Sequence, residues 1–170
     1  EGKKVDAVAQ VTKQGLVFVL DRETGEPLFD VEERPVPVSD LDGEEAWAAQ
    51  PFPVKPPPFA RQVFNENSIN TLTPEIESYV KESIKGLKFG SPYIPPSREG
   101  TVVLPGFDGG AEWGGPSFDP TSGILYVNAN EMAWNLQMVD VRLDEKTSLG
   151  LSLYRSNCTT CHGFDKKGNQ

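Results

Sequence analysis

The stretch "VDAVAQVTKQGLVFVLD", which begins at Val5, restricts the fold more than any other part of the sequence. Apolar residues alternate at its start, as in a strand buried on one face. Residues 16–20 then form a continuous apolar run, typical of a strand covered on both faces. Between the two lies the turn-like "TKQG", in which Gly15 is able to take a positive φ angle. We therefore predict two strands joined by a tight turn.

A third strand, "PLFDVEE", is predicted after the turn "DRETGEP". Three short strands joined by tight turns form most of one up-and-down β unit, such as a blade of a β-propeller. An ordinary hairpin in a β-sandwich fits the same pattern, and the pattern alone does not separate these two alternatives.

The composition supports a fold of short strands and many turns. The 170 residues include 15 prolines and 16 glycines, which is high for a helical protein. The net charge of −9 argues against nucleic acid as a partner, since phosphate neutralisation needs clustered Lys and Arg. No apolar stretch approaches the roughly 20 residues of a membrane span. The sequence begins without a methionine or an apolar signal core, and we expect both ends to be cuts in a longer protein.

Two segments between the predicted strands are expected to lie outside the sheets, one as a loop and one as a helix. Residues 35–66 are rich in proline, and their aromatic side chains favour a loop packed on the surface over a free linker. Residues 73–87 predict a helix, with Thr73 as the N-cap, Pro74 at the first position and Gly86 as the stop signal. An apolar stripe at helical spacing makes it a docking helix. The residues of this stripe are Ile76, Tyr79, Val80, Ile84 and Leu87.

Strands are predicted again beyond this helix, in "GTVVLPG", "GGPSFDP" and "GILYVNANEM", with the turn "DPTSG" between the last two. The segment "MAWNLQMVDVRL" also alternates and predicts a strand leading away. The segment "SLGLSLYRSN" then starts a helical pattern. The predicted fold class is therefore mainly β.

The segment Cys158-Thr-Thr-Cys161-His162 uses both cysteines and the only histidine of the protein. Covalent haem attachment needs two thiols at this spacing and a histidine directly after them to bind the iron. A thiol–disulfide switch is an alternative, whereas a zinc site would need a second ligand pair that the sequence lacks. The favoured hypothesis is haem c, with Cys158 and Cys161 as the covalent links and His162 as the axial ligand. The sixth ligand stays unassigned, because Met132 and Met138 lie on predicted strands upstream.

Three sequence segments resemble one known family: "VTKQGLVFVLDRETGEPLFDVEERPVP", "PPSREGTVVLPGFDGGAEWGG" and "ILYVNAN". They are similar to the dehydrogenases that use pyrroloquinoline quinone (PQQ), and most to the branch of the membrane-type glucose dehydrogenases. The resemblance covers residues 1 to about 130. It implies an eight-bladed β-propeller, of which this chain would form about two blades. It also implies oxidation of a sugar or alcohol hydroxyl, and some branches carry a fused or inserted cytochrome c domain.

The resemblance also implies roles for individual residues. Lys13 would reach the carbonyl oxygens of the quinone, where a cation stabilises the charge that develops as hydride arrives. Asn128 would bind the cofactor by hydrogen bonds, and Trp113 would lie close to the same site, whereas Glu112 is interpreted as structural. The family's catalytic base and its ligands for a divalent metal (Ca or Mg) lie in earlier blades, so none is expected in this chain.

Together these observations predict two parts: residues 1–143 as part of a quinoprotein propeller, and residues 144–170 as the truncated start of a cytochrome c domain. The predicted parent is a periplasmic quinohaemoprotein dehydrogenase, which passes electrons to another cytochrome or a quinone-pool protein. The alternatives are a non-catalytic propeller module that carries a cytochrome c, and a thiol-switch protein. The chain alone is expected to be inactive, with residues 16–20 exposed unless the helix, the proline-rich loop or self-association covers them.

Overall fold

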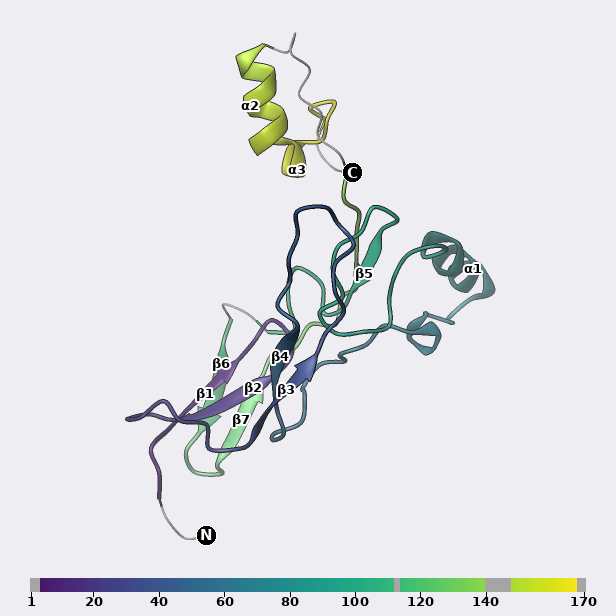
Figure 1. The fold of residues 1–170 in the computed structure, drawn as a ribbon. Helices are drawn as coiled ribbons and strands as arrows, with labels where there is room; N and C mark the ends of the chain where they lie inside the picture. Colours follow the sequence, from purple (N-terminus) through teal and green to yellow (C-terminus); the bar gives the residue numbers. More distant parts are fainter. Residues whose placement is uncertain (1–3, 112–113, 140–147, 168–170) are drawn as a thin grey trace. The chain divides into compact units, whose positions relative to one another are not determined.

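The computed structural model describes residues 4–111, 114–139 and 148–167, which belong to two compact units, residues 1–138 and 139–170 (Figure 1). The first unit contains the strands and the longest helix. Its elements are β1 (Ala7–Val11), β2 (Val17–Asp21), β3 (Val31–Pro35), β4 (Ala49–Pro53), the 3-10 helix η1 (Glu66–Ser68), α1 (Pro74–Ser83), β5 (Thr101–Val103), β6 (Pro116–Asp119), β7 (Ile124–Val127) and β8 (Trp134–Leu136). The second unit contains α2 (Leu149–Asn157) and α3 (Thr159–His162).

The described strands form four antiparallel pairs: β1–β2, β3–β4, β5–β8 and β6–β7. The prediction of a mainly β fold is confirmed at this level, and the described pairs do not close into a propeller. The third predicted strand was only partly right. Its start pairs with β2 through a bridge between Leu20 and Pro27, and the chain then leaves to form β3, which pairs with β4 instead. The amides of Asp21 and Leu28 donate to the carbonyls of Glu26 and Val19 on either side of this bridge, at 2.8 Å each.

The β1–β2 turn forms as the sequence predicts. Val11 pairs with Val17, and the amides of Thr12 and Gly15 donate to Leu16 and Thr12 carbonyls at 3.0 Å each. Gly15 has a φ of 80°, the left-handed conformation that glycine adopts without strain. The turn thereby fixes the register of the hairpin.

The proline-rich stretch is more regular than the predicted loop, because it contains β4 and the start of η1. Register pairs join Val31 to Pro53 and Pro35 to Ala49. This strand was missed because two of its residues, Pro51 and Pro53, are prolines, which weaken a strand signal. Residues 59–62 of this stretch follow β4 and contact the β1–β2 turn, where the amide of Phe59 donates to the Gly15 carbonyl at 2.9 Å.

Two apolar clusters form the core of the first unit. The first contains Val11, Val17 and Ala111, against which Phe59 and Leu125 pack. Leu16 and Val17 are 1% and 4% exposed, so the run of residues 16–20 is covered at its start, as the sequence predicts for a stable chain. Its cover comes from the proline-rich segment and from the β6–β7 hairpin, which lies beside β1–β2 in Figure 1. Helix α1 takes no part in this cover.

Helix α1 instead docks on the second cluster, formed by Phe64, Ile69 and Val102. The predicted start is confirmed, since Thr73 accepts a hydrogen bond from the Ile76 amide and Pro74 is the first helical residue. The helix ends at Ser83, four residues before the predicted end. Of the predicted stripe, three residues pack on the cluster and Tyr79 is 75% exposed. The three that pack are Val80, Ile84 and Leu87.

The second unit begins with α2, whose predicted helical pattern is confirmed. Ser148 caps it through a hydrogen bond from the Leu151 amide. Cys158 ends α2 and is also the N-cap of α3. Within the described parts of the chain, no helix has the length and apolar character needed to cross a membrane.

Candidate functional site

Lys13 lies exposed on the turn between β1 and β2, as the sequence predicts. Its ammonium donates to the Phe107 carbonyl at 3.0 Å, and its own carbonyl accepts from the Gly110 amide at 2.6 Å. The turn is therefore joined to the loop of residues 107–111, which lies far from it in the sequence. The Lys13 side chain is therefore held against this loop while the residue stays exposed.

Asn128 follows the last residue of β7 and is exposed. Two residues later, the amide of Asn130 donates to the carbonyl of Gly110 at 2.8 Å. Gly110 thus bonds to the Lys13 turn through its N–H and to the loop after β7 through its C=O. The structure therefore brings the Lys13 segment and the Asn128 segment to one place. We call this meeting point, residues 13–15, 59–62, 107–111 and 128–131, the junction.

The junction is packed so closely that its glycines have no room for a side chain. A Cβ on Gly15 would lie 2.7 Å from the Cβ of Ala60, and one on Gly110 would lie 2.9 Å from the Cα of Gly15. A Cβ on Gly109 would lie 2.7 Å from the Cγ of Lys13. Real carbon atoms do not approach this closely, so glycine is required at these positions for the segments to meet.

The proline-rich segment closes the junction from a further side. Arg61 uses its backbone N–H and its Nε to bind the two carboxylate oxygens of Glu131, at 2.7 and 2.6 Å. Gln62 donates from Nε2 to the Gln14 carbonyl at 2.6 Å. The hydrogen bonds from Arg61 lower the pKa of Glu131, those of the backbone N–H first. Sequence reasoning missed Arg61, Gln62 and Glu131, because no local pattern indicates contacts over such a separation.

The resemblance places Trp113 near the quinone, and Glu112 is interpreted as structural. Both residues lie outside the described part of the chain. The residue before them, Ala111, is buried in the first apolar cluster together with Val11 and Val17. The role proposed for Trp113 therefore stays a prediction.

A cavity of about 270 Å³ lies beside Lys13 and is lined also by Gln62, Tyr93 and Phe107. Tyr93 has a φ of 54°, which is uncommon for a residue with a side chain. Its ring packs edge-on against Phe52, and burial raises the pKa of its hydroxyl. The cavity combines an apolar wall with a few polar groups, a combination typical of a ligand site.

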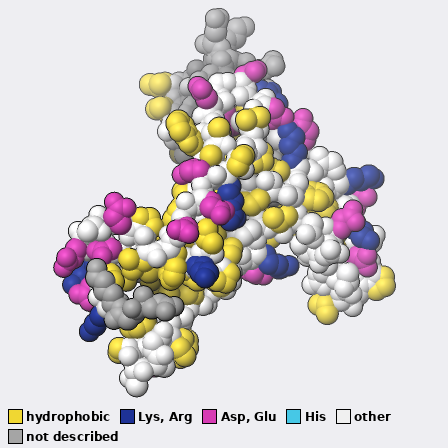
Figure 2. Space-filling model, turned by 60° about the horizontal axis from the view of Figure 1, so that its bottom comes forward, with side chains coloured by type: hydrophobic (Ala, Val, Ile, Leu, Met, Phe, Trp, Pro, Cys, Tyr) yellow, Lys and Arg dark blue, Asp and Glu magenta, His cyan; other side chains and the backbone are white. Residues whose placement is uncertain are grey.

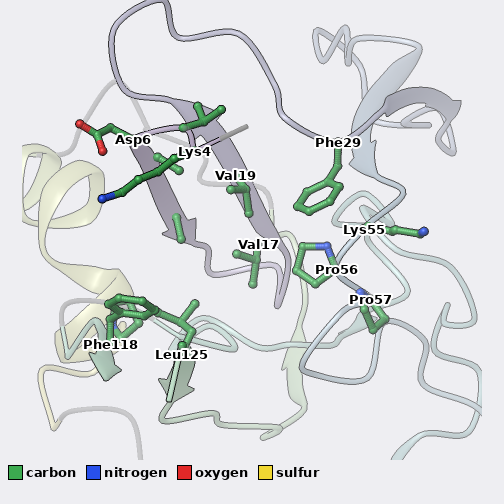
Figure 3. Close-up of a pocket in the computed structure, with 15 residues that line it drawn as sticks. Lys4, Asp6, Val17, Val19, Phe29, Lys55, Pro56, Pro57, Phe118 and Leu125 are labelled. Carbon is green, nitrogen blue, oxygen red and sulfur yellow. The ribbon is translucent and has the colours of Figure 1, made fainter. Parts of the chain in front are cut away.

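A larger cavity lies elsewhere. It is an apolar groove of about 1060 Å³, and Figure 3 shows Val17, Val19 and Leu125 pointing into it from β2 and β7. Hydrophobic side chains also lie open on the surface drawn in Figure 2. Neither Lys13 nor Asn128 lines this groove. Its described lining is mostly apolar, with Lys4, Asp6 and Lys55 as the charged residues.

The Cys158–His162 segment folds into one helical turn. The amides of Cys161 and His162 donate to the Cys158 carbonyl at 3.3 and 2.9 Å. Cys158 precedes this turn as its N-cap, and Cys161 and His162 lie within the turn. Tyr154 supports the turn from α2, because its hydroxyl donates to the Gly163 carbonyl at 2.8 Å.

Both thiols are free, Cys161 is exposed and Cys158 is partly exposed. The donor set and its spacing therefore fit covalent haem attachment, which needs two free thiols and a nearby imidazole. The described residues contain no group of three or more His, Cys, Asp or Glu side chains that is arranged to hold a metal ion. The divalent metal that the resemblance implies stays a prediction about the rest of the parent protein.

Comparison with known proteins adds independent information. Residues 1–157 match the PQQ family model described as glucose/ethanol/alcohol dehydrogenase, β-propeller domain. The chain is 32% identical over 139 residues to the quinate/shikimate dehydrogenase (quinone) of Acinetobacter baylyi. The aligned region covers 82% of this chain and 17% of that protein. It is 33% identical over 156 residues to the glycerol dehydrogenase large subunit of Gluconobacter thailandicus. This aligned region covers 90% of this chain and 20% of that protein.

A third relative is the quinoprotein glucose dehydrogenase of Gluconobacter oxydans, 30% identical over 142 residues, or 82% of this chain and 17% of that protein. The chain spans about a fifth of the length of the curated relatives it matches. No solved structure matches it. Since the family model covers most of the chain, the chain belongs to the PQQ family of glucose, ethanol and alcohol dehydrogenases, within their β-propeller domain.

Proposed function

We propose that the chain is part of a periplasmic PQQ-dependent dehydrogenase that oxidises a hydroxyl group of a sugar, alcohol or related polyol. The family match supports the class of reaction, and the names of the relatives include quinate, glycerol and glucose as substrates. The observation that carries the proposal is the junction, where Gly110 joins the Lys13 turn to the loop that follows Asn128.

The residues at the junction fit an anionic ortho-quinone. Bound there, PQQ would supply the two-electron oxidation. Lys13 would place its ammonium beside the quinone oxygens and stabilise negative charge that develops on them. Asn128 would hold the cofactor through its side-chain amide, which lies exposed at the end of an apolar strand. The surrounding loops would keep both groups in place, because the Lys13 carbonyl accepts from the Gly110 amide and the amide of Asn130, two residues after Asn128, donates to the Gly110 carbonyl.

The test is the replacement of Lys13 and Asn128 in the complete dehydrogenase. Lys13→Ala is expected to slow substrate oxidation by about 10²–10³-fold, with a change in the free energy of unfolding within about 0.5 kcal/mol. Asn128→Ala is expected to weaken PQQ binding to the apoenzyme. Lys85→Ala, an exposed lysine near the end of α1, is the control and should change neither quantity. Activity within twofold of wild type in Lys13→Ala would show that this lysine is only a turn residue.

We further propose that the second unit begins a cytochrome c domain through which electrons leave the quinone. Cys158 and Cys161 would hold the haem covalently, and His162 would bind its iron. The support is the free state of both thiols and the single helical turn that begins after Cys158 and contains Cys161 and His162. Covalent haem attachment also accords with a periplasmic location and with a cytochrome or a quinone-pool protein as electron acceptor.

This second proposal is tested by maturing the complete protein with a haem-attachment system. Mass spectrometry should find one haem on Cys158 and Cys161, and His162→Ala should lose the low-spin absorption spectrum. Lys167→Ala, a few residues further on, is the control and should keep that spectrum. A protein that carries haem but never oxidises a hydroxyl substrate would favour the alternative, a non-catalytic propeller module with a cytochrome c. Absence of any haem adduct would leave the thiol-switch alternative.

A further inference from the structure

One ion pair of the first unit ties together two segments that lie 70 residues apart in the sequence. Each carboxylate oxygen of Glu131 accepts one hydrogen bond from Arg61, Oε1 from the backbone N–H at 2.7 Å and Oε2 from Nε at 2.6 Å. Two parallel, charge-assisted bonds fix orientation as well as distance. Because one donor belongs to the backbone, the pair holds the chain at Arg61 itself and not only its side chain.

Glu131 directly follows the part of the chain that carries the proposed cofactor amide. It lies three residues after Asn128 and one after Asn130, whose N–H binds the Gly110 carbonyl. The loop after β7 is therefore held at two adjacent residues, by Gly110 on one side and by Arg61 on the other. Two adjacent attachments restrict how far Asn128 can move away from the junction.

The segment that carries Arg61 also holds the Lys13 turn. The amide of Phe59 and the Nε2 of Gln62 donate to the carbonyls of Gly15 and Gln14, at 2.9 and 2.6 Å. Ala60 lies against Gly15 in the space that a side chain would need. Residues 59–62 thus contact both segments that carry the proposed cofactor-binding side chains, and a shift of this segment would move one relative to the other.

The other described ion pairs do not have this arrangement. Most join residues close in sequence, such as Lys81 and Glu77 on α1. The pair between Lys88 and Asp40 spans a similar separation and lies outside the junction. Exposed ion pairs contribute little to stability on average. An effect of the Arg61–Glu131 pair is therefore expected in the geometry of the site more than in the free energy of unfolding.

We infer that Arg61 and Glu131 are positioning residues, which hold the Asn128 loop at the correct place relative to the Lys13 turn for cofactor binding. This inference rests on the proposed function, since it takes Lys13 and Asn128 as the groups that bind the quinone. Binding sites depend on supporting contacts that hold the binding groups to within about 0.5 Å. The proposed positioning role does not require Arg61 or Glu131 to contact the cofactor.

The experiment uses Arg61→Met, Glu131→Gln and the double variant in the complete dehydrogenase, with Lys81→Met as a matched control that also breaks an exposed ion pair. The measurement is the dissociation constant of PQQ, by titration of the apoenzyme, together with the melting temperature. Each single variant should weaken PQQ binding about fivefold, and the double variant no more than either, because the two act as one unit. Arg61→Lys keeps the charge and should recover part of the affinity. Lys81→Met should bind PQQ like wild type.

Lys13→Ala and Asn128→Ala, titrated in parallel, distinguish a failure of the positioning role from a failure of the proposed function. If they weaken PQQ binding and the Arg61 and Glu131 variants do not, the positioning role is wrong and the proposed function stands. If neither Lys13→Ala nor Asn128→Ala changes the affinity, the proposed function fails and the positioning role fails with it. A loss of affinity in Lys81→Met equal to that in Arg61→Met would show a general effect of broken ion pairs and would also overturn the inference.

Discussion

Replacing Gly15 by alanine would test the close packing of the junction. Gly15 has a φ of 80°, and a Cβ there would lie 2.7 Å from the Cβ of Ala60. The left-handed conformation costs an alanine about 1 kcal/mol, and forcing a methyl group into filled space costs a further 1–3 kcal/mol, roughly. Gly15→Ala should therefore lower the free energy of unfolding by about 2–4 kcal/mol, a large part of the roughly 5–15 kcal/mol of an ordinary domain.

The assay is urea denaturation followed by circular dichroism, with Gly25→Ala as the control. Gly25 has a φ of 77°, and a Cβ there would meet no atom within 4 Å. Its replacement should cost only the conformational part, about 1 kcal/mol, and the difference between the two variants isolates the contact with Ala60. Ala60→Gly in the Gly15→Ala background should restore part of the loss. Equal destabilisation by Gly15→Ala and Gly25→Ala would refute the reasoning.

Two further predictions concern single elements. Thr73→Ala removes the cap of α1, whose hydroxyl accepts from the Ile76 amide, and should lower the free energy of unfolding by about 1 kcal/mol in the same assay. Hydrogen bonds from Ser122 and Thr121 lower the pKa of Asp119 in the β6–β7 turn. Because the pKa is lower in the folded state, this stabilisation is present above the ordinary aspartate pKa of about 3.9 and is lost as the pH falls through the lowered value. Ser122→Ala should make the acid unfolding transition shallower, and an unchanged transition would contradict this.

Features encoded by local sequence were predictable. The β1–β2 turn follows from one glycine between two apolar runs, and α1 follows from Thr73 and Pro74 at its start. The end of α1 was placed too late, because the apolar stripe continues beyond Ser83 in residues that pack without being helical. Patterns of spacing do not distinguish these two states.

Features that depend on distant contacts were not predictable. The partner of β3 is a strand inside a proline-rich stretch, and prolines hide the strand signal. The resemblance pointed to Lys13 and Asn128, whereas Arg61 and Glu131 carry no local signal and emerge only from the three-dimensional structure. A charged pair of this kind looks in the sequence like two ordinary surface residues.

The long-range contacts of the junction have a consequence for the order of folding. The hairpins β1–β2 and β6–β7 close over short loops, whereas the hydrogen bonds at the junction join residues 48, 70 and 94 positions apart. Closing a longer loop costs more chain entropy, and non-local contacts form more slowly. The hairpins should therefore assemble early and the junction late, so that a nascent chain becomes competent to take up its cofactor only at the end of folding.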